Sequence, residues 1–551
     1  MRLKKIIATL LLASMTLSMV ACSSSDSSTS TTDTSSSSSS SSSDSSAATT
    51  EAVVVTTEKG DGEYACSDTP IELDTFAIFQ ETYVLQTDQP IVQEIAAFTN
   101  VQMIGAASEY TSSSAEAFNL LMTKVELPDM IGGNYLDIAK YGAEGAFIPL
   151  NDLLEEYAPD IMAIFEKYPE VQAAMTSEDG NIYAVPFVYS DTLAQVWYIR
   201  QDWLDLLGLD MPTTVDEYEA VLTAFVNEDP NGNGVKDEIG FFMRQNNYDH
   251  NLIPLMSLWG IQDQWYVNAD GEVAIGSYSQ EFKAAMEGIS DWYAKGLIDP
   301  EIFIADNYVR DQFFAADTGG STHDWIPSTS GYNDSITEYV EDFFISAMLP
   351  PADTNGDVWE PLTRGRITGN AWGISCDNEY PVESIKLMNF LFTDKGRDIV
   401  TYGIEGETFT YNDAGEPIYT DDVLNSDQAV NTLINSMGGG NQCVAYLHDA
   451  SYEAQMMSAS GADDLDMYLE ADVVDNLYPL IPTLSFTSDE TEILTSTWVA
   501  CRSYMCEKIE AWTYDGSLIE KEFDTYIETL QKMGMDDVVQ VYNDAYARMM
   551  G

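Results

Sequence analysis

From residue 71 onward the chain alternates strand-like and helix-like segments, and this alternation restricts its possible folds more than any other feature. The first five segments are predicted, in order, as strand, helix, strand, helix and very short strand, at 71–79, 89–98, 103–107, 115–123 and 129–131. Alternation of this kind is typical of βα units that build a parallel sheet. The sequence therefore predicts an α/β fold.

Later segments add hairpins and a helical C-terminal part. The dipeptides Asp179-Gly180 and Asp270-Gly271 indicate hairpin turns. Apolar residues at helical spacing predict further helices, which we place at 279–295 (ended by Gly296), 382–393, 520–532 and 535–549.

Composition indicates a folded protein with an unusual charge. Hydrophobic residues make up 45% and charged residues 21%, which excludes a chain that is disordered throughout. The 551 residues suffice for about three domains or two large lobes. Lys and Arg number 23 against 91 Asp and Glu, a formal net charge of −68. Such a chain repels phosphate backbones and anionic membrane surfaces, which argues against nucleic-acid binding.

The first 22 residues have the features of a bacterial lipoprotein signal. Basic residues within 2–5 precede an apolar stretch at 6–20 that is too short for a comfortable bilayer span. Cys22 follows Met-Val-Ala, a sequence that resembles a lipobox, although Met19 stands where Leu is usual. The alternative is an ordinary secretory signal followed by a chance Cys. We expect export and acylation of Cys22.

A polar tether follows the predicted anchor. Residues 23–50 are almost all Ser and Thr, with no apolar residue before Ala47. Such a segment buries nothing to offset its ordering entropy, so we expect 23–66 to be a disordered tether. No later stretch is apolar for long enough to span a bilayer.

The segment 229–238 (DPNGNGVKDE) places oxygen-bearing residues at alternate positions of a tight loop. The candidate ligands are the side chains of Asp229, Asn231, Asn233, Asp237 and Glu238 and the carbonyl of Val235. Oxygens arranged in this way suit calcium, which takes about six to eight oxygen ligands. Position 12 is Gly240 rather than the Glu of an EF-hand, so Glu238 is expected to close the loop. The alternative is a polar turn without metal, which is our prediction for the shorter echo at 353–357.

The sequence contains few residue patterns that indicate catalytic chemistry. His250, His323 and His448 are scattered, and no phosphate loop, HExxH or GxSxG motif occurs. Carboxylate pairs suited to glycoside hydrolysis occur by chance in a chain with 91 acids, so that class stays open. Besides Cys22, five cysteines remain without a CxxC pair, which indicates buried thiols and one unassigned disulfide at most.

The order of several motifs resembles family 1 extracellular solute-binding proteins, the lipoprotein receptors of ABC importers, in their large oligosaccharide-type branch. The strongest stretch is WYIRQDWLDLLGLDMPTTVDE at 197–217, followed by DPNGNGVKDEIG. Other matching motifs are LPDMI, EGAFIPLNDLLEEYAPDI, DGNIYAVP, YAKGLIDPEIF, ESIKLMNFLFTDKG, YGIEGETF and FDTYIETLQKMGMDDVVQVYNDAY. Together they cover nearly everything from about residue 70 to the end.

The resemblance implies two α/β lobes, joined by hinge crossings, that close over a solute. It places lobe 1 at 67–188 with 368–430, and lobe 2 at 189–367 with 431–551. It also implies a structural calcium site at the loop residues named above, remote from the ligand.

Candidate solute contacts combine that implied cleft with the chemistry of sugars. Sugar sites pair aromatic platforms with a few polar groups, and α/β sheets bind ligands beyond the carboxyl ends of their strands. The residues chosen are Glu81, Asn134, Tyr135, Trp259, Asp324, Trp325, Arg366 and Trp372. Burial in the core is an equal alternative for each aromatic, and Trp203 and Trp292 are expected in the core.

The sequence therefore predicts a substrate-binding lipoprotein of an ABC importer, anchored outside the bacterial cell membrane, that binds an oligosaccharide and catalyses no reaction. Its expected partners are a small-molecule solute, the membrane permease subunits of the importer and the membrane itself, through the lipid anchor. Two alternatives stay open: a surface-anchored carbohydrate-active enzyme and a sensory ligand-binding lipoprotein.

Overall fold

A computed structural model of the chain describes residues 62–550, apart from fourteen short interruptions. These are 80–82, 109–112, 191–192, 194, 245–248, 337–338, 341, 363, 427, 441–444, 449–450, 458, 472–479 and 482–483. Cys22, residues 23–61 of the predicted tether, and Glu81 lie outside the described residues. The predicted tether extends too far, because Cys66 is buried in the core of the first sheet. In the part of the chain that the structure describes, every helix is too short or too polar to cross a bilayer.

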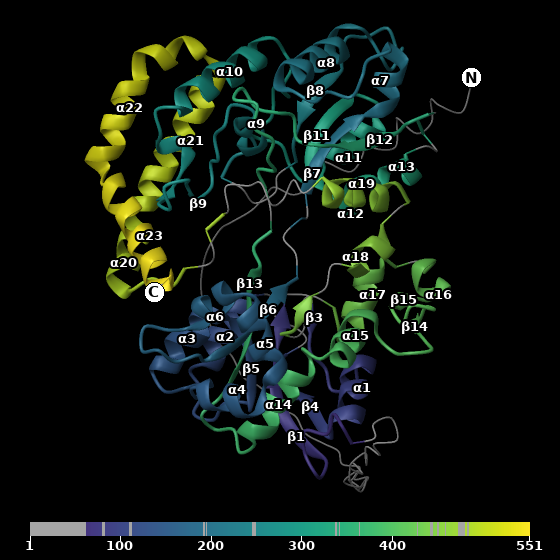
Figure 1. Ribbon diagram of the computed structural model, residues 1–551, viewed down its shortest axis with the longest axis vertical. Helices are drawn as coiled ribbons and strands as arrows, with labels where there is room; N and C mark the ends of the chain where they lie inside the picture. Colours follow the sequence, from purple (N-terminus) through teal and green to yellow (C-terminus); the bar gives the residue numbers. More distant parts are fainter. Residues whose placement is uncertain are drawn as a thin grey trace, which may run out of the picture. The chain divides into compact units, whose positions relative to one another are not determined.

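Six strands of the described residues form a mixed sheet, in the order β16-β6-β13-β5-β1-β4 (Figure 1). Their bounds are β1 (Ile71–Phe76), β4 (Val101–Gly105), β5 (Met130–Asn134), β6 (Ala184–Tyr189), β13 (Ile367–Ile374) and β16 (Leu447–His448). Strand β1 is parallel to β4 and β5, as expected from the βα alternation. Strand β13 is antiparallel to both β5 and β6, so the sheet is not wholly parallel.

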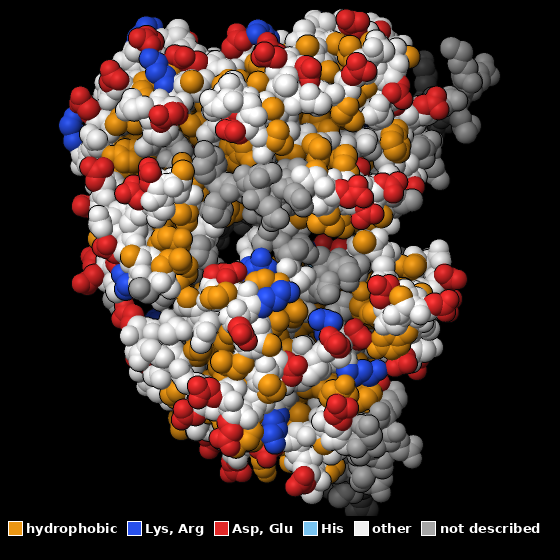
Figure 2. Space-filling view, in the orientation of Figure 1, with side chains coloured by type: hydrophobic (Ala, Val, Ile, Leu, Met, Phe, Trp, Pro, Cys, Tyr) orange, Lys and Arg blue, Asp and Glu red, His pale blue; other side chains and the backbone are white. Residues whose placement is uncertain are grey.

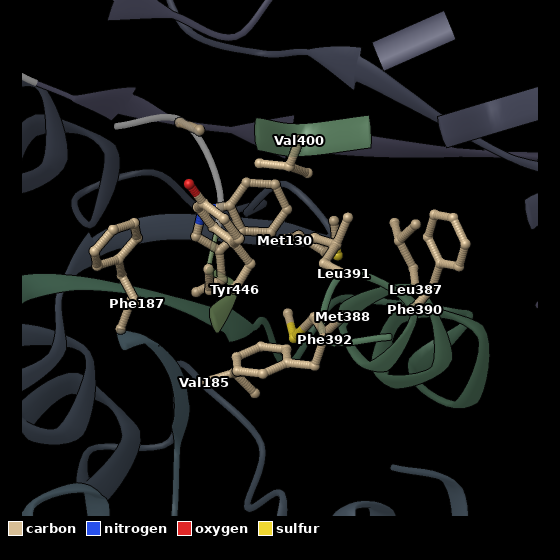
Figure 3. Packing of buried hydrophobic residues seen from close by; sticks show 14 of the residues in the cluster. Met130, Val185, Phe187, Leu387, Met388, Phe390, Leu391, Phe392, Val400 and Tyr446 are labelled. Carbon is tan, nitrogen blue, oxygen red and sulfur yellow. The ribbon is translucent and has the colours of Figure 1, made fainter. Parts of the chain in front are cut away.

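Short helices and hairpins accompany this first sheet. The helices are α1 (Pro90–Thr99), α2 (Ser114–Leu121), α3 (Tyr135–Ala143), α4 (Asn151–Tyr157), α5 (Pro159–Lys167), α6 (Pro169–Met175), α14 (Pro381–Phe390), α15 (Asp394–Tyr402), α16 (Asp421–Leu424), α17 (Val430–Ser436) and α18 (Ser451–Met456). The short strands are β2 (Ile78–Phe79), β3 (Tyr83–Val84), β14 (Phe409–Tyr411) and β15 (Pro417–Tyr419). Figure 3 shows part of the core, where Phe187 of β6 lies near Tyr446, with their ring centroids 5.3 Å apart.

A second sheet of the described residues has the order β12-β7-β11-β8. Its strands are β7 (Gln195–Arg200), β8 (Ile239–Phe242), β11 (Gly319–Trp325) and β12 (Ile345–Met348). Strands β8 and β11 are parallel, whereas β7 is antiparallel to β11 and β12. Gly319 and Gly320 begin strand β11. A Cβ on Gly320 would lie 2.8 Å from the Phe225 ring, so the small residue lets the strand approach α8.

Helices that accompany the second sheet include the C-terminal ones. They are α7 (Gln201–Leu207), α8 (Val215–Asn227), α9 (Ile253–Ser257), α10 (Phe282–Ala294), α11 (Val309–Ala315), α12 (Ile326–Ser330), α13 (Tyr332–Ser335), α19 (Ala459–Glu470), α20 (Ser488–Ile493), α21 (Val499–Tyr514), α22 (Ile519–Met533) and α23 (Met535–Met550). A small hairpin pairs β9 (Tyr266–Val267) with β10 (Val273–Ala274) across the predicted Asp270-Gly271 turn. In Figure 1, α21 and α22 lie beside α10, and their side chains share its core.

The buried residues show where the chain passes between the two cores. Ile434, Tyr446 and Tyr452 pack in the core of the first sheet, although the family resemblance implied lobe 2 for everything after 430. Tyr468, on α19, packs against the second sheet. The prediction that the segment 431–452 belongs to lobe 2 is wrong, because strand β16 pairs with β6 of the first sheet. This pairing joins residues far apart in the sequence, so no local pattern predicts it.

Candidate functional site

Two charged side chains meet at the carboxyl ends of β8 and β11. The register pairs Phe242 with Thr322, so two residues further along the chain Arg244, just past the end of β8, stands level with Asp324 of β11. The Nε of Arg244 donates to Oδ2 of Asp324 at 2.7 Å, and its Nη2 donates to Oδ1 at 2.9 Å. This bidentate pair fixes the orientation of both groups.

A second arginine shares the same carboxylate. Arg310, on α11, donates from Nη1 to Oδ2 of Asp324 at 2.8 Å and also to the hydroxyls of Ser328 and Thr329. Arg310 is 8% exposed, and its Nε has no hydrogen-bond partner among the described residues. Two guanidinium groups therefore share one fully buried carboxylate.

Trp325, the candidate aromatic platform, follows this cluster directly. Its backbone N–H donates to Oδ1 of Asp324 at 2.7 Å, and its side chain is partly exposed. It is the last residue of β11 and directly precedes α12, so it lies at the carboxyl end of a strand, the edge at which α/β sheets bind ligands. The structure thus brings Asp324 and Trp325 together with Arg244 and Arg310, which sequence reasoning missed.

At the first sheet, Asn134 ends β5 and caps α3. Its side-chain oxygen accepts from the Leu136 N–H at 3.0 Å, and the residue is exposed. Tyr135 is buried in the core instead. Trp372 is 0% exposed and belongs to the core of the first sheet. On β13, it pairs with Gly132 of the neighbouring strand β5. The structure therefore does not support the predicted contact between Trp372 and a solute, because the ring is covered on all sides.

Arg366 is held by internal contacts. Its Nε donates to Glu170 at 3.0 Å, and its Nη1 donates to the carbonyls of Tyr189 and Ser190. Its guanidinium also lies over the Tyr168 ring, 4.0 Å from the centroid. These contacts fasten the start of β13 to the end of β6.

Trp259 packs against Trp292 with ring centroids 5.1 Å apart, and a Cβ on Gly288 would overlap its ring. It therefore covers helix α10 as part of the packing of the second core. Trp203 and Trp292 are buried there, which confirms the prediction that both belong to the core.

The oxygen-rich loop lies at the opposite end of the same two strands. Helix α8 ends at Asn227, β8 begins at Ile239, and the loop 229–238 joins them. The Gly234 N–H donates to the carboxylate of Asp229, at 3.1 Å from Oδ2, and Asn233 donates from Nδ2 to Asp237 at 3.0 Å. The Nδ2 of Asn231 donates to the Asp317 carbonyl at 2.8 Å, which ties the loop to the start of β11.

Glu238 is the unusual member of this loop. It is 7% exposed, and neither carboxylate oxygen has a hydrogen-bond partner among the described residues. Burial, together with the charges of Asp237 and Asp229, raises its pKa. The described residues hold no group of three or more His, Cys, Asp or Glu side chains that could bind a metal ion. The loop also offers amide and carbonyl oxygens, which are not among those side-chain types. The oxygen-only donors and the orphaned carboxylate of Glu238 fit a hard cation.

The three histidines are buried beside carboxylates. His250 lies 2.8 Å from Asp263, His323 lies 2.6 Å from Glu360, and His448 lies 3.3 Å from Glu453. Burial would raise the pKa of Glu453, but the hydrogen bond with His448 and the charge of Arg364 outweigh it, so its pKa is lowered. Each pair joins elements of a core.

The cysteines of the described residues are all free thiols: Cys66, Cys376, Cys501 and Cys506. Burial raises the pKa of Cys66 to about 12 and that of Cys506 to about 11, so both are protonated at neutral pH.

The model of bacterial extracellular solute-binding proteins matches residues 92–398, more than half of the chain. The chain belongs to this family. Among solved structures, the alginate-binding protein AlgQ2 superposes with a TM-score of 0.69 at 32% identity, over 88% of this chain and 99% of that one. FusA of S. pneumoniae with kestose has a TM-score of 0.65 at 22% identity, over 87% and 99% of the two chains, a likeness in fold.

Curated relatives match a shorter part. The fructooligosaccharide ABC transporter substrate-binding protein FusA of Streptococcus pneumoniae serotype 4 is 35% identical over 213 residues. The lipoprotein LipO of Bacillus subtilis is 28% identical over 200 residues. Each match covers 36% of this chain, and they cover 40% of FusA and 39% of LipO. A further FusA structure is described as an EF-hand mutant in complex with fructo-nystose.

Proposed function

We propose that this chain is the substrate-binding lipoprotein of an ABC importer and that it captures an oligosaccharide outside the cell membrane by closing two lobes over it. Family membership supports a binding role, and FusA and AlgQ2 are described as binding proteins for fructooligosaccharide and alginate. The observation that carries the proposal is Trp325, a partly exposed aromatic beside the charged donors at the carboxyl ends of β8 and β11.

The chemistry of that arrangement suits a sugar. A pyranose or furanose ring presents an apolar C–H face, which packs on an indole, and a rim of hydroxyls, which bond to fixed polar groups. Trp325 supplies the flat face, and the exposed amide of Asn134 on the first sheet supplies a polar group from the other proposed lobe. Free energy for closure comes from contacts made only in the closed state, since a ligand that binds both states equally shifts nothing.

Calcium is proposed as a structural ion in the loop 229–238, held by Asp229, Asn231, Asn233, Asp237, Glu238 and the carbonyl of Val235. When bound, the ion supplies positive charge to the buried carboxylate of Glu238. The loop residues then fix the start of β8, and through Asn231 and the Asp317 carbonyl they fix the start of β11.

The anchor is proposed to be a lipid on Cys22, which would hold the folded part at the cell surface through the Ser-rich tether. Cys22→Ala should release the protein from membranes or block its processing, which cell fractionation and immunoblotting would detect. Unchanged membrane retention would overturn the anchor and leave the solute site untouched.

A thermal-shift screen of neutral and acidic glycans tests the binding role. A true solute present at 100 times its dissociation constant should stabilise the full chain by about 2.7 kcal/mol, and mass spectrometry should recover it intact. Recovery of a cleaved glycan would contradict the binding role and would show that the protein is a carbohydrate-active enzyme. A screen in which no glycan shifts the melting temperature would contradict the proposal.

A further inference from the structure

Asp324 has no capacity left to bind a solute hydroxyl. Its carboxylate accepts four hydrogen bonds, two from Arg244, one from Arg310 and one from the Trp325 N–H. A carboxylate offers about four lone-pair sites, so this one is saturated. Asp324, a candidate solute contact in the sequence, therefore positions the two arginines instead of accepting a hydrogen bond from the solute.

The donors that remain belong to the arginines. Arg244 is bonded through Nε and one N–H of Nη2, and its side chain is 18% exposed. The Nε of Arg310 has no hydrogen-bond partner among the described residues, and the contacts of Arg244 with Asp324 use its Nε and Nη2. Guanidinium groups only donate hydrogen bonds, so the complementary ligand group is an acceptor.

Charge decides which acceptor fits best. Arg244 and Arg310 face each other across one carboxylate, and Asp311, the next acidic neighbour of Arg310, is exposed and bonded to the Tyr332 hydroxyl. Water screens the exposed Asp311, whereas the buried guanidinium of Arg310 lacks a second counter-charge. Hydrogen bonds between charged partners are roughly twice as strong as neutral ones, so a carboxylate fits better than a hydroxyl.

The acidic surface does not outweigh this local excess. Figure 2 shows acidic side chains spread over the visible face of a chain whose formal net charge is −68. At physiological ionic strength these charges are screened beyond about 8 Å, while a ligand carboxylate on Arg244 would lie within hydrogen-bond distance. An acidic surface also means that an anionic solute needs cations placed in the site itself.

Resting on the proposed function, we infer that the solute is a carboxylate-bearing oligosaccharide whose acid group binds Arg244 and is supported by Arg310, beside Trp325. Uronic acids and sialic acids present the same group, and the experiment separates these two sources.

Calorimetric titrations of the full chain compare matched probes. Trigalacturonate is paired with its methyl ester, and sialyllactose is paired with lactose. We expect one of the two acids to bind at least tenfold more tightly than its neutral partner, and the acid that binds identifies the source of the carboxylate. The inference is overturned if a neutral probe binds as tightly as the acidic probe with which it is paired.

Substitutions test whether Arg244 is the residue that binds the carboxylate of the probe. Arg244→Gln should weaken the acidic probe about tenfold to a hundredfold, with Arg244→Lys in between, because a charge-assisted hydrogen bond is lost. Binding of a neutral probe should change less than twofold. The control is Arg397→Gln, on α15, where the arginine pairs with an exposed Asp394.

The failures are distinguishable. If neutral glycans bind and acidic ones do not, the inference is wrong and the proposed function stands. If Arg244→Gln weakens acidic and neutral probes equally, the arginine has a packing role and the inference is again wrong. If none of these four probes binds, the inference fails, and the thermal-shift screen of neutral and acidic glycans decides separately whether the proposed function stands.

Discussion

The two ends of the parallel pair β8 and β11 carry opposite charges. At the amino end, the loop 229–238 gathers carboxylates around Glu238, whose oxygens lack partners among the described residues. At the carboxyl end, Arg244 and Arg310 share the single carboxylate of Asp324. Glu238 and Arg244 are six residues apart, about 20 Å of extended chain, which exceeds the screening length. One strand pair thus separates the proposed calcium loop from the proposed site for an anionic group.

Removing the shared carboxylate of Asp324 should change the free energy of unfolding more than any other substitution considered at the two ends of this strand pair. Asp324→Ala leaves two arginines without it, one of them buried, and should lower the free energy of unfolding by about 3–5 kcal/mol in urea titrations. Asp311→Ala is the matched control, because Asp311 is an exposed acidic neighbour of the same arginine. A loss below about 1 kcal/mol for Asp324→Ala would show that the arginines do not depend on this pairing.

Asp464 sharpens the comparison, because it is a buried carboxylate beside β12 that pairs with no arginine among the described residues. Burial raises its pKa to about 6, above the ordinary value of 3.8. The folded state therefore binds the proton more tightly, and this group costs stability as pH rises from about 4 to above 6, on the order of 3 kcal/mol in full.

Asp464→Asn should accordingly be more stable relative to wild type at pH 8 than at pH 4. Denaturant titrations at the two pH values measure this difference. A stability difference that is the same at both would contradict the raised pKa.

Calcium removal probes the acidic end. A chelator should lower the melting temperature, since calcium at 100 times its dissociation constant contributes about 2.7 kcal/mol. Glu238→Gln should abolish the response and should exceed wild type in stability when chelator is present, because the unpartnered buried carboxylate is gone.

A matched control exists in the similar loop at 353–357, where Asp353 accepts the N–H groups of Asn355 and Asp357 as an ordinary turn. Asp357→Asn should keep the wild-type response to chelator. Wild-type melting that ignores chelator would count against an exchangeable ion in the loop 229–238.

Trp325→Ala gives the smallest expected effect. It should cost about 1–3 kcal/mol of solute affinity, the scale of burying one large side chain, with the fold retained. Calorimetry with a bound glycan measures it, and circular dichroism checks the fold. Trp259→Phe is the control, since Trp259 packs against Trp292. Equal affinity of Trp325→Ala and wild type would remove Trp325 from the site.

Local signals predicted much of the fold. Helix α10 was found because apolar residues recur at helical spacing and Gly296, with φ of +74°, ends it. Helices α22 and α23 were found in the same way, and Asp270-Gly271 gave the hairpin of β9 and β10. The antiparallel placement of β13 was missed, because its pairing joins residues far apart in sequence.

The site was only partly predictable for the same reason. Arg244 and Asp324 are 80 residues apart, and they meet because of the register between β8 and β11. An arginine two residues after the end of a short buried strand is the signal that could have found it. Trp372 looked like a ligand contact because aromatic type alone does not distinguish a platform from a core residue.

Small-angle X-ray scattering of the full chain, with and without a saturating glycan from the screen, tests solute capture by lobe closure most directly. Closure predicts a smaller radius of gyration when the glycan is bound, with no change for a sugar that does not bind. An unchanged radius of gyration at a glycan concentration that calorimetry shows to be saturating would contradict the account.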